Sequence, residues 1–271
     1  AHPTRGPPRK GHATVPAMAP SDDAPAPEQT AALIAGGAGG VGLAVARRLE
    51  VQGYRVVLLV RDARKGREAA RRLTREPAVY ACDVTDRKAV DEAVREAAAR
   101  VGPPLVLVNA AGVAESRPLL PPDDELWART LAVNTTGPWL TTTACLPFMK
   151  KAGHGFVCTV ASTAALEGYR YTAAYVASKH AVLGLTRALA ADLAGSGVRV
   201  TTVCPGFLDT PMTARTIANM TTKTGMPEAE ARAALGGMNR SGRLIDPDEV
   251  AAAIMALLEG ERTEAEPNRI D

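Results

Sequence analysis

From Thr30 onward, short apolar runs alternate with longer stretches of helical periodicity. The runs are rich in β-branched residues and end near glycine or polar residues: AALIAGG, YRVVLLVR, AVYACDV, LVLVNAAG, GFVCTVAS and VRVTTVCPG. Apolar strands joined by helices are typical of a parallel sheet that is covered on both faces. With right-handed crossovers, the sequence predicts an α/β fold with a doubly wound parallel sheet of the Rossmann type.

The pattern predicts one domain, residues 30–271, preceded by a disordered tail, residues 1–29. The tail is rich in proline and nearly free of large apolar side chains, so burial cannot offset the entropy lost on ordering it. Met18 is a candidate for the natural start of the chain. A basic tail that recruits a partner is the less favoured alternative.

Composition argues against several classes of partner. The 32 basic and 29 acidic residues give a net charge of +3, and aromatic residues make up 4%, which provides no signature of nucleic-acid or membrane-surface binding. Four widely spaced cysteines form no metal-binding motif, and no apolar run has membrane-spanning length. We therefore expect a cytoplasmic protein that acts on a small molecule and binds no metal.

A glycine-rich turn follows the first predicted strand. Gly36, Gly40 and Gly42 form G-x-x-x-G-x-G before an amphipathic stretch. Glycines allow the backbone to approach a pyrophosphate, and the amino end of the helix offers free N–H groups. Such turns also occur for tight packing alone, but this position in a βαβ unit favours a dinucleotide site.

The second predicted strand ends at Val60, where a carboxylate would bind ribose hydroxyls and repel a 2′-phosphate, and Arg61 follows. An arginine there can pair with the phosphate, so we expect NADPH/NADP. A solvent-exposed arginine is the alternative, and Asp62 leaves NADH/NAD possible. Asp83, after the third strand, could accept from the adenine amino group or cap the helix that begins near Asp86.

Tyr175 and Lys179 occur as Y-V-A-S-K in a predicted helix, where four-residue spacing places both side chains on one face. Tyrosine has a pKa of about 10 and needs a nearby positive charge to act in acid–base catalysis. Ser162 ends the fifth strand and can hydrogen-bond a developing alkoxide. An isolated Y-x-x-x-K pair usually lies on a surface, but the preceding serine favours a catalytic site.

With these motifs, residues 31–258 resemble the compact branch of the short-chain dehydrogenase/reductase family. The matching segments are AGGAGGVG, ACDV, VNAAG, AVNTTG, YVASK and PGFLDTP. The sequence is similar to β-ketoacyl and polyketide ketoreductases in ELWARTLAVN, YVASKHAVLGLT and VCPGFLDTPM. Ala35, Ala110 and the carboxyl end depart from the family, which normally has a threonine, a second asparagine, and a last strand with a glycine pair.

The resemblance implies a role for each matching residue. Tyr175 would donate a proton to the carbonyl oxygen, Lys179 would bind the ribose and lower the tyrosine pKa, Ser162 would polarise the carbonyl, and Asn134 would hold a relay water. The implied cofactor-binding residues are Gly36, Gly40, Val41, Gly42, Arg61, Asp83, Val84, Asn109, Gly112, Tyr175, Lys179, Pro205, Gly206, Leu208 and Thr210. Relatives form homotetramers, so we expect a homo-oligomer, a dimer or a tetramer.

Residues 211–240 interrupt the repeating pattern and predict a helical substrate lid; a plain surface hairpin is the alternative. The candidates for its inner face are Met212, Met220, Met226 and Met238, and Tyr169 and Tyr171 could line the pocket mouth. A basic patch for a carrier phosphate could include Arg215, Lys223 or Arg243. We assign no catalysis to His154 or His180.

The sequence thus predicts an oxidoreductase that interconverts a ketone and a secondary alcohol by hydride transfer. By similarity, the favoured substrate class is a 3-oxoacyl/3-hydroxyacyl thioester. A small hydrophobic or sugar secondary alcohol, or a steroid, is the alternative substrate. A non-catalytic dinucleotide-binding sensor is the alternative function, but such proteins usually lose the tyrosine or the lysine.

Overall fold

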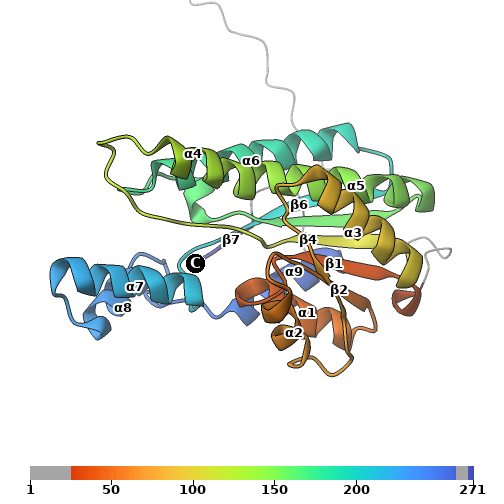
Figure 1. Cartoon of the computed structure of the whole chain (residues 1–271), viewed down its shortest axis with the longest axis horizontal. Helices are drawn as coiled ribbons and strands as arrows, with labels where there is room; N and C mark the ends of the chain where they lie inside the picture. Colours follow the sequence, from red (N-terminus) through yellow and green to blue (C-terminus); the bar gives the residue numbers. More distant parts are fainter. Residues whose placement is uncertain (1–25, 261–267) are drawn as a thin grey trace, which may run out of the picture.

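The computed structural model describes residues 26–260 and 268–271, and these form a parallel seven-stranded sheet in the order β3-β2-β1-β4-β5-β6-β7 (Figure 1). The strands are β1 Ala31–Ala35, β2 Arg55–Val60, β3 Ala78–Ala81, β4 Pro104–Asn109, β5 Gly155–Val160, β6 Val198–Pro205 and β7 Asn268–Ile270. Strand order reverses between β1 and β4, so ligands are expected at the carboxyl ends of these strands. The predicted doubly wound fold is confirmed.

Helices cover both faces of the sheet, as Figure 1 shows. The helices are α1 Gly40–Val51, α2 Ala63–Ala70, α3 Arg87–Arg100, α4 Asp124–Leu131, α5 Gly137–Ala152, α6 Ala173–Asp192, α7 Pro211–Thr224, α8 Glu228–Gly236 and α9 Pro247–Leu258. One layer contains α1, α2 and α9, and the other contains α3, α4, α5 and α6. Short turns of other helix types lie at η1 Pro27–Gln29, η2 Ala132–Thr136 and η3 Thr163–Ala165.

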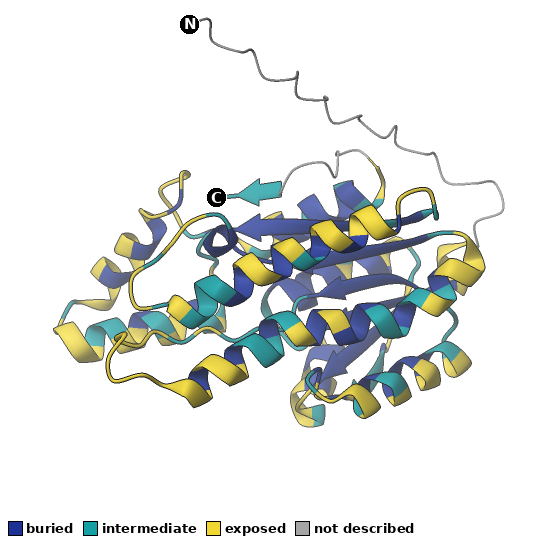
Figure 2. Ribbon diagram, turned by 90° about the horizontal axis from the view of Figure 1, so that it is seen from above, coloured by how far each residue is buried: buried dark blue, intermediate teal, exposed yellow. Residues whose placement is uncertain are grey.

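Alternate residues of each central strand enter different hydrophobic cores. In β1, Ala32 and Ile34 pack with α1 and α9, whereas Ala31 and Leu33 pack with α3 and α5. This follows from the two-residue period of strand side chains. Both faces are therefore apolar, and the strands lie buried between helices whose outer sides are exposed (Figure 2).

The structure differs from the sequence prediction at both ends of the domain. Residues 26–29 were expected in the disordered tail, but Pro27–Gln29 forms a 3₁₀ turn whose Pro27 carbonyl accepts from Thr30 N at 3.0 Å. Residues 1–25 of that tail lie outside the described residues. A last strand was not expected, yet Asn268–Ile270 forms β7 and pairs with Val203–Pro205 of β6. Three residues are too few for a recognisable period in sequence.

The α7–α8 hairpin lies at one end of the molecule, apart from the main helical layers (Figure 1). It has a hydrophobic cluster of its own, formed by Ile217, Ala231 and Leu235. Met220 and Met226 pack against this cluster, as expected for the inner face. The same expectation is wrong for Met238, which is 49% exposed because it follows the end of α8.

Candidate active site

Helix α6 places Tyr175 and Lys179 on one face. The Lys179 Nζ lies 5.6 Å from the centroid of the Tyr175 ring. Lys179 is only 5% exposed, and its Nζ donates to the carbonyl of Val160, at the end of β5, at 2.9 Å. This hydrogen bond fixes the ammonium group at the carboxyl edge of the sheet.

Ser162 follows β5 and forms the N-cap of η3, where its Oγ accepts from Ala164 N at 3.1 Å. The Ser162 side chain also interacts with Tyr175, where it acts to lower the pKa of the phenol. The structure therefore brings Ser162, Tyr175 and Lys179 together at one place, as the sequence predicts. Their juxtaposition results from packing α6 beside the end of β5.

Burial governs the ionisation of the pair. Loss of solvation raises the pKa of Tyr175, and the hydrogen bond to Ser162 opposes this shift only in part. Burial also lowers the pKa of Lys179 to about 8. In this structure the pKa of Tyr175 is raised rather than lowered, because burial disfavours the charged phenolate.

Asn134 lies in a π-helical turn, η2, between α4 and α5. It is 1% exposed, and its Nδ2 donates to the Val113 carbonyl at 2.9 Å and to Ser178 Oγ at 3.0 Å. Its Oδ1 accepts from Val113 N at 2.9 Å. Both amide hydrogens of Asn134 are used in these bonds. A relay water would therefore have to donate a hydrogen bond to the side-chain or main-chain oxygen of Asn134.

Ser178 is a site residue that the sequence interpretation missed. Its Oγ accepts from Asn134 and donates to the Tyr175 carbonyl at 2.7 Å, so it joins η2 to the turn of α6 that carries Tyr175 and Lys179. Its place directly before Lys179 in the Y-V-A-S-K motif was the available signal. Gly112 lies beside the same group, since a Cβ there would be 3.4 Å from Asn134 Oδ1 and 3.8 Å from Lys179 Nζ.

The glycine turn after β1 packs too closely for side chains. Gly36 has φ +86°, and a Cβ there would lie 2.5 Å from Ala111 N. At Gly42 a Cβ would lie 2.4 Å from the Gly36 carbonyl oxygen, and the adjacent Val41 is buried. At Gly39 a Cβ would meet nothing within 4 Å, which leaves open space beside the amino end of α1. This arrangement fits a bound pyrophosphate.

The two departures from the family pattern near this turn contact each other. The Ala110 N–H donates to the Ala35 carbonyl at 2.8 Å. The main chain therefore joins the ends of β1 and β4 at the two positions that lack the family's polar side chains.

After β2, Arg61 is exposed, whereas Asp62 caps α2 by accepting from Arg64 N at 2.9 Å and Lys65 N at 3.2 Å. Asp62 is thus committed to the helix. Hydrogen bonds from the backbone and side chain of Thr85 lower the pKa of Asp83, and the charge of Arg61 contributes. Asp86 caps α3, so the alternative role of Asp83 as that cap is wrong.

Two further cofactor candidates are buried. Asn109 is 3% exposed, and its amide is engaged with the hydroxyls of Thr141 at 2.7 Å and Thr142 at 3.3 Å. Val84 is 8% exposed, and a Cβ on Gly137 would lie 2.9 Å from its side chain. Their side chains join the ends of the strands to α5.

Residues 205–210 pass from β6 to α7. The Gly206 N–H donates to Ile270 of β7 at 2.8 Å, and Leu208 forms an isolated bridge with Ile245. Thr210 caps α7, and a Cβ on Gly40 would lie 3.4 Å from the Thr210 side chain. The segment therefore lies beside the glycine turn, as expected for one that contacts the same cofactor.

The two tyrosines proposed for the pocket mouth differ. Tyr169 is partly buried, donates to Thr163 Oγ1 at 2.9 Å and meets the Phe207 ring edge-on at a centroid distance of 6.0 Å. Tyr171 is 56% exposed and has φ +64°, an unusual value for a residue with a side chain. Tyr169 thus packs toward the Ser162 turn, and Tyr171 lies at the surface.

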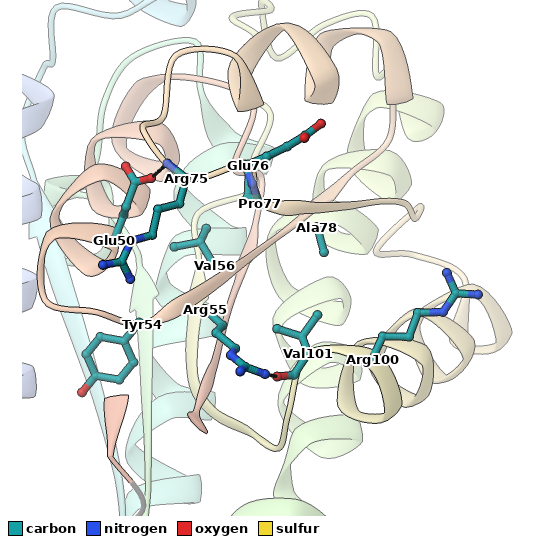
Figure 3. Close-up of a pocket in the computed structure, with 10 residues that line it drawn as sticks. All are labelled: Glu50, Tyr54, Arg55, Val56, Arg75, Glu76, Pro77, Ala78, Arg100 and Val101. Atoms are coloured by element: carbon teal, nitrogen blue, oxygen red, sulfur yellow. Dashed lines mark hydrogen bonds between the residues drawn. The ribbon is translucent and has the colours of Figure 1, made fainter. Parts of the chain in front are cut away.

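A hollow of about 260 Å³ lies away from this site, at the edge of the sheet where β2 and β3 begin (Figure 3). Glu50, Tyr54, Arg55, Arg75 and Arg100 contribute to its lining. Arg55 donates to the Val101 carbonyl at 2.8 Å, and the Glu50 carboxylate accepts from the backbone of Thr74 at 3.0 Å. None of the proposed catalytic or cofactor-binding residues lines it.

Among the described residues, no helix has both the length and the hydrophobicity needed to cross a membrane. Within the same residues, no three His, Cys, Asp or Glu side chains lie together in a way that could hold a metal ion.

Comparisons with known proteins agree with the observed fold. The family profile described as short chain dehydrogenase matches residues 30–221. A Streptomyces coelicolor protein provisionally named ketoacyl reductase is 35% identical over 84% of this chain and 89% of its own length. Cis-4-hydroxycyclohexanecarboxylate dehydrogenase of Sinomonas cyclohexanicum is 36% identical over 83% of this chain and 88% of its own. The crystal structure of an actinorhodin polyketide ketoreductase variant with NADPH has a TM-score of 0.83 and 31% identity, covering 90% of this chain and 95% of that one.

Proposed function

The chain belongs to the short-chain dehydrogenase family, and we propose that it reduces a ketone to a secondary alcohol with NADPH at the site formed by Ser162, Tyr175 and Lys179. As a member, it is an oxidoreductase that acts on alcohol or ketone groups with a nicotinamide dinucleotide. The observation that carries the proposal is the position of the Lys179 ammonium, 5.6 Å from the centroid of the Tyr175 ring and hydrogen-bonded to Val160 at the end of β5, which Ser162 follows.

When bound, the dinucleotide supplies a hydride from its nicotinamide C4 to the carbonyl carbon. Ser162 donates a hydrogen bond to the carbonyl oxygen and stabilises the negative charge that develops there. Tyr175 transfers its phenolic proton to that oxygen, which completes the alcohol. Lys179 stabilises the resulting phenolate, and its contact with Val160 holds it in place. The protein mainly positions and polarises the reactants.

NADPH is the proposed cofactor because Arg61 is exposed after β2, whereas the neighbouring carboxylate, Asp62, caps α2. A free carboxylate at this place would repel a 2′-phosphate, and an arginine attracts it. The similar ketoreductase structure with NADPH supports the same choice. The glycine turn, the open space at Gly39 and Thr210 would hold the rest of the dinucleotide.

For the substrate we propose a 3-oxoacyl thioester, which the names of two relatives support. The second candidate is a small hydrophobic or sugar secondary alcohol, and the name of the Sinomonas relative favours an alicyclic one. We also propose that the α7–α8 hairpin is a substrate lid.

The test is NADPH consumption by the purified protein with acetoacetyl thioesters, alicyclic ketones and keto sugars. We expect the highest kcat/KM with a thioester, and a higher value with a small ketone would favour the second candidate. Tyr175→Phe should abolish turnover and leave NADPH binding nearly unchanged, because it removes only the phenolic hydroxyl that carries the transferred proton. Tyr54→Phe, far from the site, is the matched control. Wild-type activity in Tyr175→Phe would remove Tyr175 from the acid–base role.

We further propose a homo-oligomer, a dimer or a homotetramer. Trp127 of α4 is 46% exposed and Trp139 of α5 is 43% exposed, and large aromatic side chains are enriched in protein interfaces. Light scattering of the purified protein measures the assembly directly, and a monomer would exclude this proposal. The cytoplasmic location expected from the sequence stays a prediction.

A further inference from the structure

A buried asparagine joins the two ends of the α7–α8 hairpin. Asn239 follows α8 and is 4% exposed. Its Oδ1 accepts from Phe207 N at 2.8 Å, and its Nδ2 donates to the carbonyls of Phe207 at 2.9 Å and Arg243 at 2.7 Å. The side chain thus binds the segment that enters the hairpin and the segment that leaves it.

The close packing around Asn239 leaves no room for an added side chain at Gly206. A Cβ on Gly206 would lie 2.1 Å from Asn239 Oδ1, so the amide sits directly against the main chain between β6 and α7. Backbone bonds complete the junction, since Ile245 N donates to Phe207 at 3.0 Å and Asp209 N donates to Ile245 at 2.9 Å.

The junction contacts the candidate active site on two sides. The Phe207 ring packs on Tyr169, whose hydroxyl donates to Thr163, the residue after Ser162. Thr210, three residues beyond Phe207, lies against Gly40 of the glycine turn. Asn239 itself touches none of the proposed catalytic residues in its described hydrogen bonds.

We infer that Asn239 is a positioning residue that fixes the angle of the hairpin and the path of residues 206–210 beside the nicotinamide and the substrate. This inference rests on the proposed function, since Leu208 and Thr210 are among the cofactor-binding residues that the family resemblance implies. Without the amide, Phe207 N and the Arg243 carbonyl lose their side-chain partner, and the hairpin can move relative to the sheet. Hydride transfer is sensitive to such displacement, because a shift of about 1 Å can cost up to roughly a hundredfold in rate.

The experiment compares Asn239→Ala and Asn239→Asp with two controls. Asn219→Ala removes an exposed asparagine from α7, and Val94→Ala weakens the core under α3, away from the hairpin. Hydrogen–deuterium exchange of each protein is followed for residues 206–236. Steady-state kinetics with NADPH and with NADPH deuterated at C4 give kcat and its isotope effect.

We expect both Asn239 variants to exchange faster in residues 206–236 while the exchange of β1, β4 and β5 stays unchanged. Their kcat should fall by on the order of tenfold or more, with a larger isotope effect and nearly unchanged NADPH affinity. Val94→Ala should lose thermal stability without changing the isotope effect. Wild-type exchange at residues 206–236 in both variants would overturn the inference even if no ketone is turned over, and so would a wild-type kcat and isotope effect. An inactive wild-type protein would contradict the proposed function but leave the exchange result decisive.

Discussion

At the scale of single residues, the proposed catalytic groups are held where charge is costly. Burial raises the pKa of Tyr175 and lowers that of Lys179 to about 8, so each group tends toward its neutral form. Proton transfer from Tyr175 requires the opposite, a phenolate beside an ammonium. The fixed contact of Lys179 with Val160 favours the charged lysine, because the carbonyl oxygen accepts a hydrogen bond from it.

The ionisation of Lys179 predicts how reduction depends on pH. Because the pKa of Lys179 is about 8, its side chain is an ammonium below about pH 8. Above that pH the side chain becomes neutral and no longer stabilises the phenolate. We therefore expect kcat/KM for reduction to be constant below about pH 8 and to decrease above it. Lys179→Arg, which remains charged, should be slower but should lack this decrease. A decrease of the same size in Lys179→Arg would assign the ionisation to another group.

The second residue-scale prediction concerns cofactor choice. Arg61→Ala should weaken NADPH binding by about 1.5–3 kcal/mol, the range for a hydrogen bond to a charged group, and should leave NADH binding nearly unchanged. Fluorescence titration of each cofactor measures both effects. Arg64→Ala, on the exposed side of α2 with its own partner Glu68, is the control. An equal loss for NADH and NADPH would contradict the 2′-phosphate contact.

At the scale of elements, the sequence predicted what depends on local pattern. The strands β1 to β6 have continuous apolar runs, and the turn after β1 has glycines where the structure requires them, at Gly36 and Gly42. Helix α6 follows from its periodicity, which also places Tyr175 beside Lys179. These features need only short-range spacing, so one sequence suffices to find them.

Elements that depend on tertiary contacts were not predictable. The π-helical turn at Ala132–Thr136 interrupts what reads as one long helix between α4 and α5, and it places Asn134 against Ser178. Strand β7 exists because β6 offers a free edge, not because its three residues favour a strand. Asn239 has no sequence signal either, since its partners lie at Phe207 and Arg243 on separate segments.

At the scale of the whole molecule, the two ends of the parallel strands have different roles. The carboxyl ends together form what we call the carboxyl edge of the sheet, and the amino ends form its amino edge. The carboxyl edge carries the glycine turn, Ser162 and residues 205–210, and the amino edge carries the hollow of about 260 Å³ and the first turn of the described chain. The turn at Pro27–Gln29 packs at this amino edge, because a Cβ on Gly102 would lie 2.6 Å from the Gln29 carbonyl oxygen. Changes at the amino edge should therefore affect stability without affecting catalysis.

Two truncations test this separation and the domain boundary. Deleting residues 1–25 should leave the melting temperature and kcat/KM unchanged, because this segment is rich in proline and nearly free of large apolar side chains. Deleting residues 1–29 also removes the Ala26 and Pro27 carbonyls that accept from Thr30, at 3.3 Å and 3.0 Å. Losing these two bonds should lower the free energy of unfolding by about 1–3 kcal/mol, and each kcal/mol corresponds to a loss of about 2–4 °C in melting temperature. Because the active site lies at the opposite edge, kcat/KM at 25 °C should stay the same in both proteins. A loss of activity in the shorter deletion would place residues 1–25 within the functional domain.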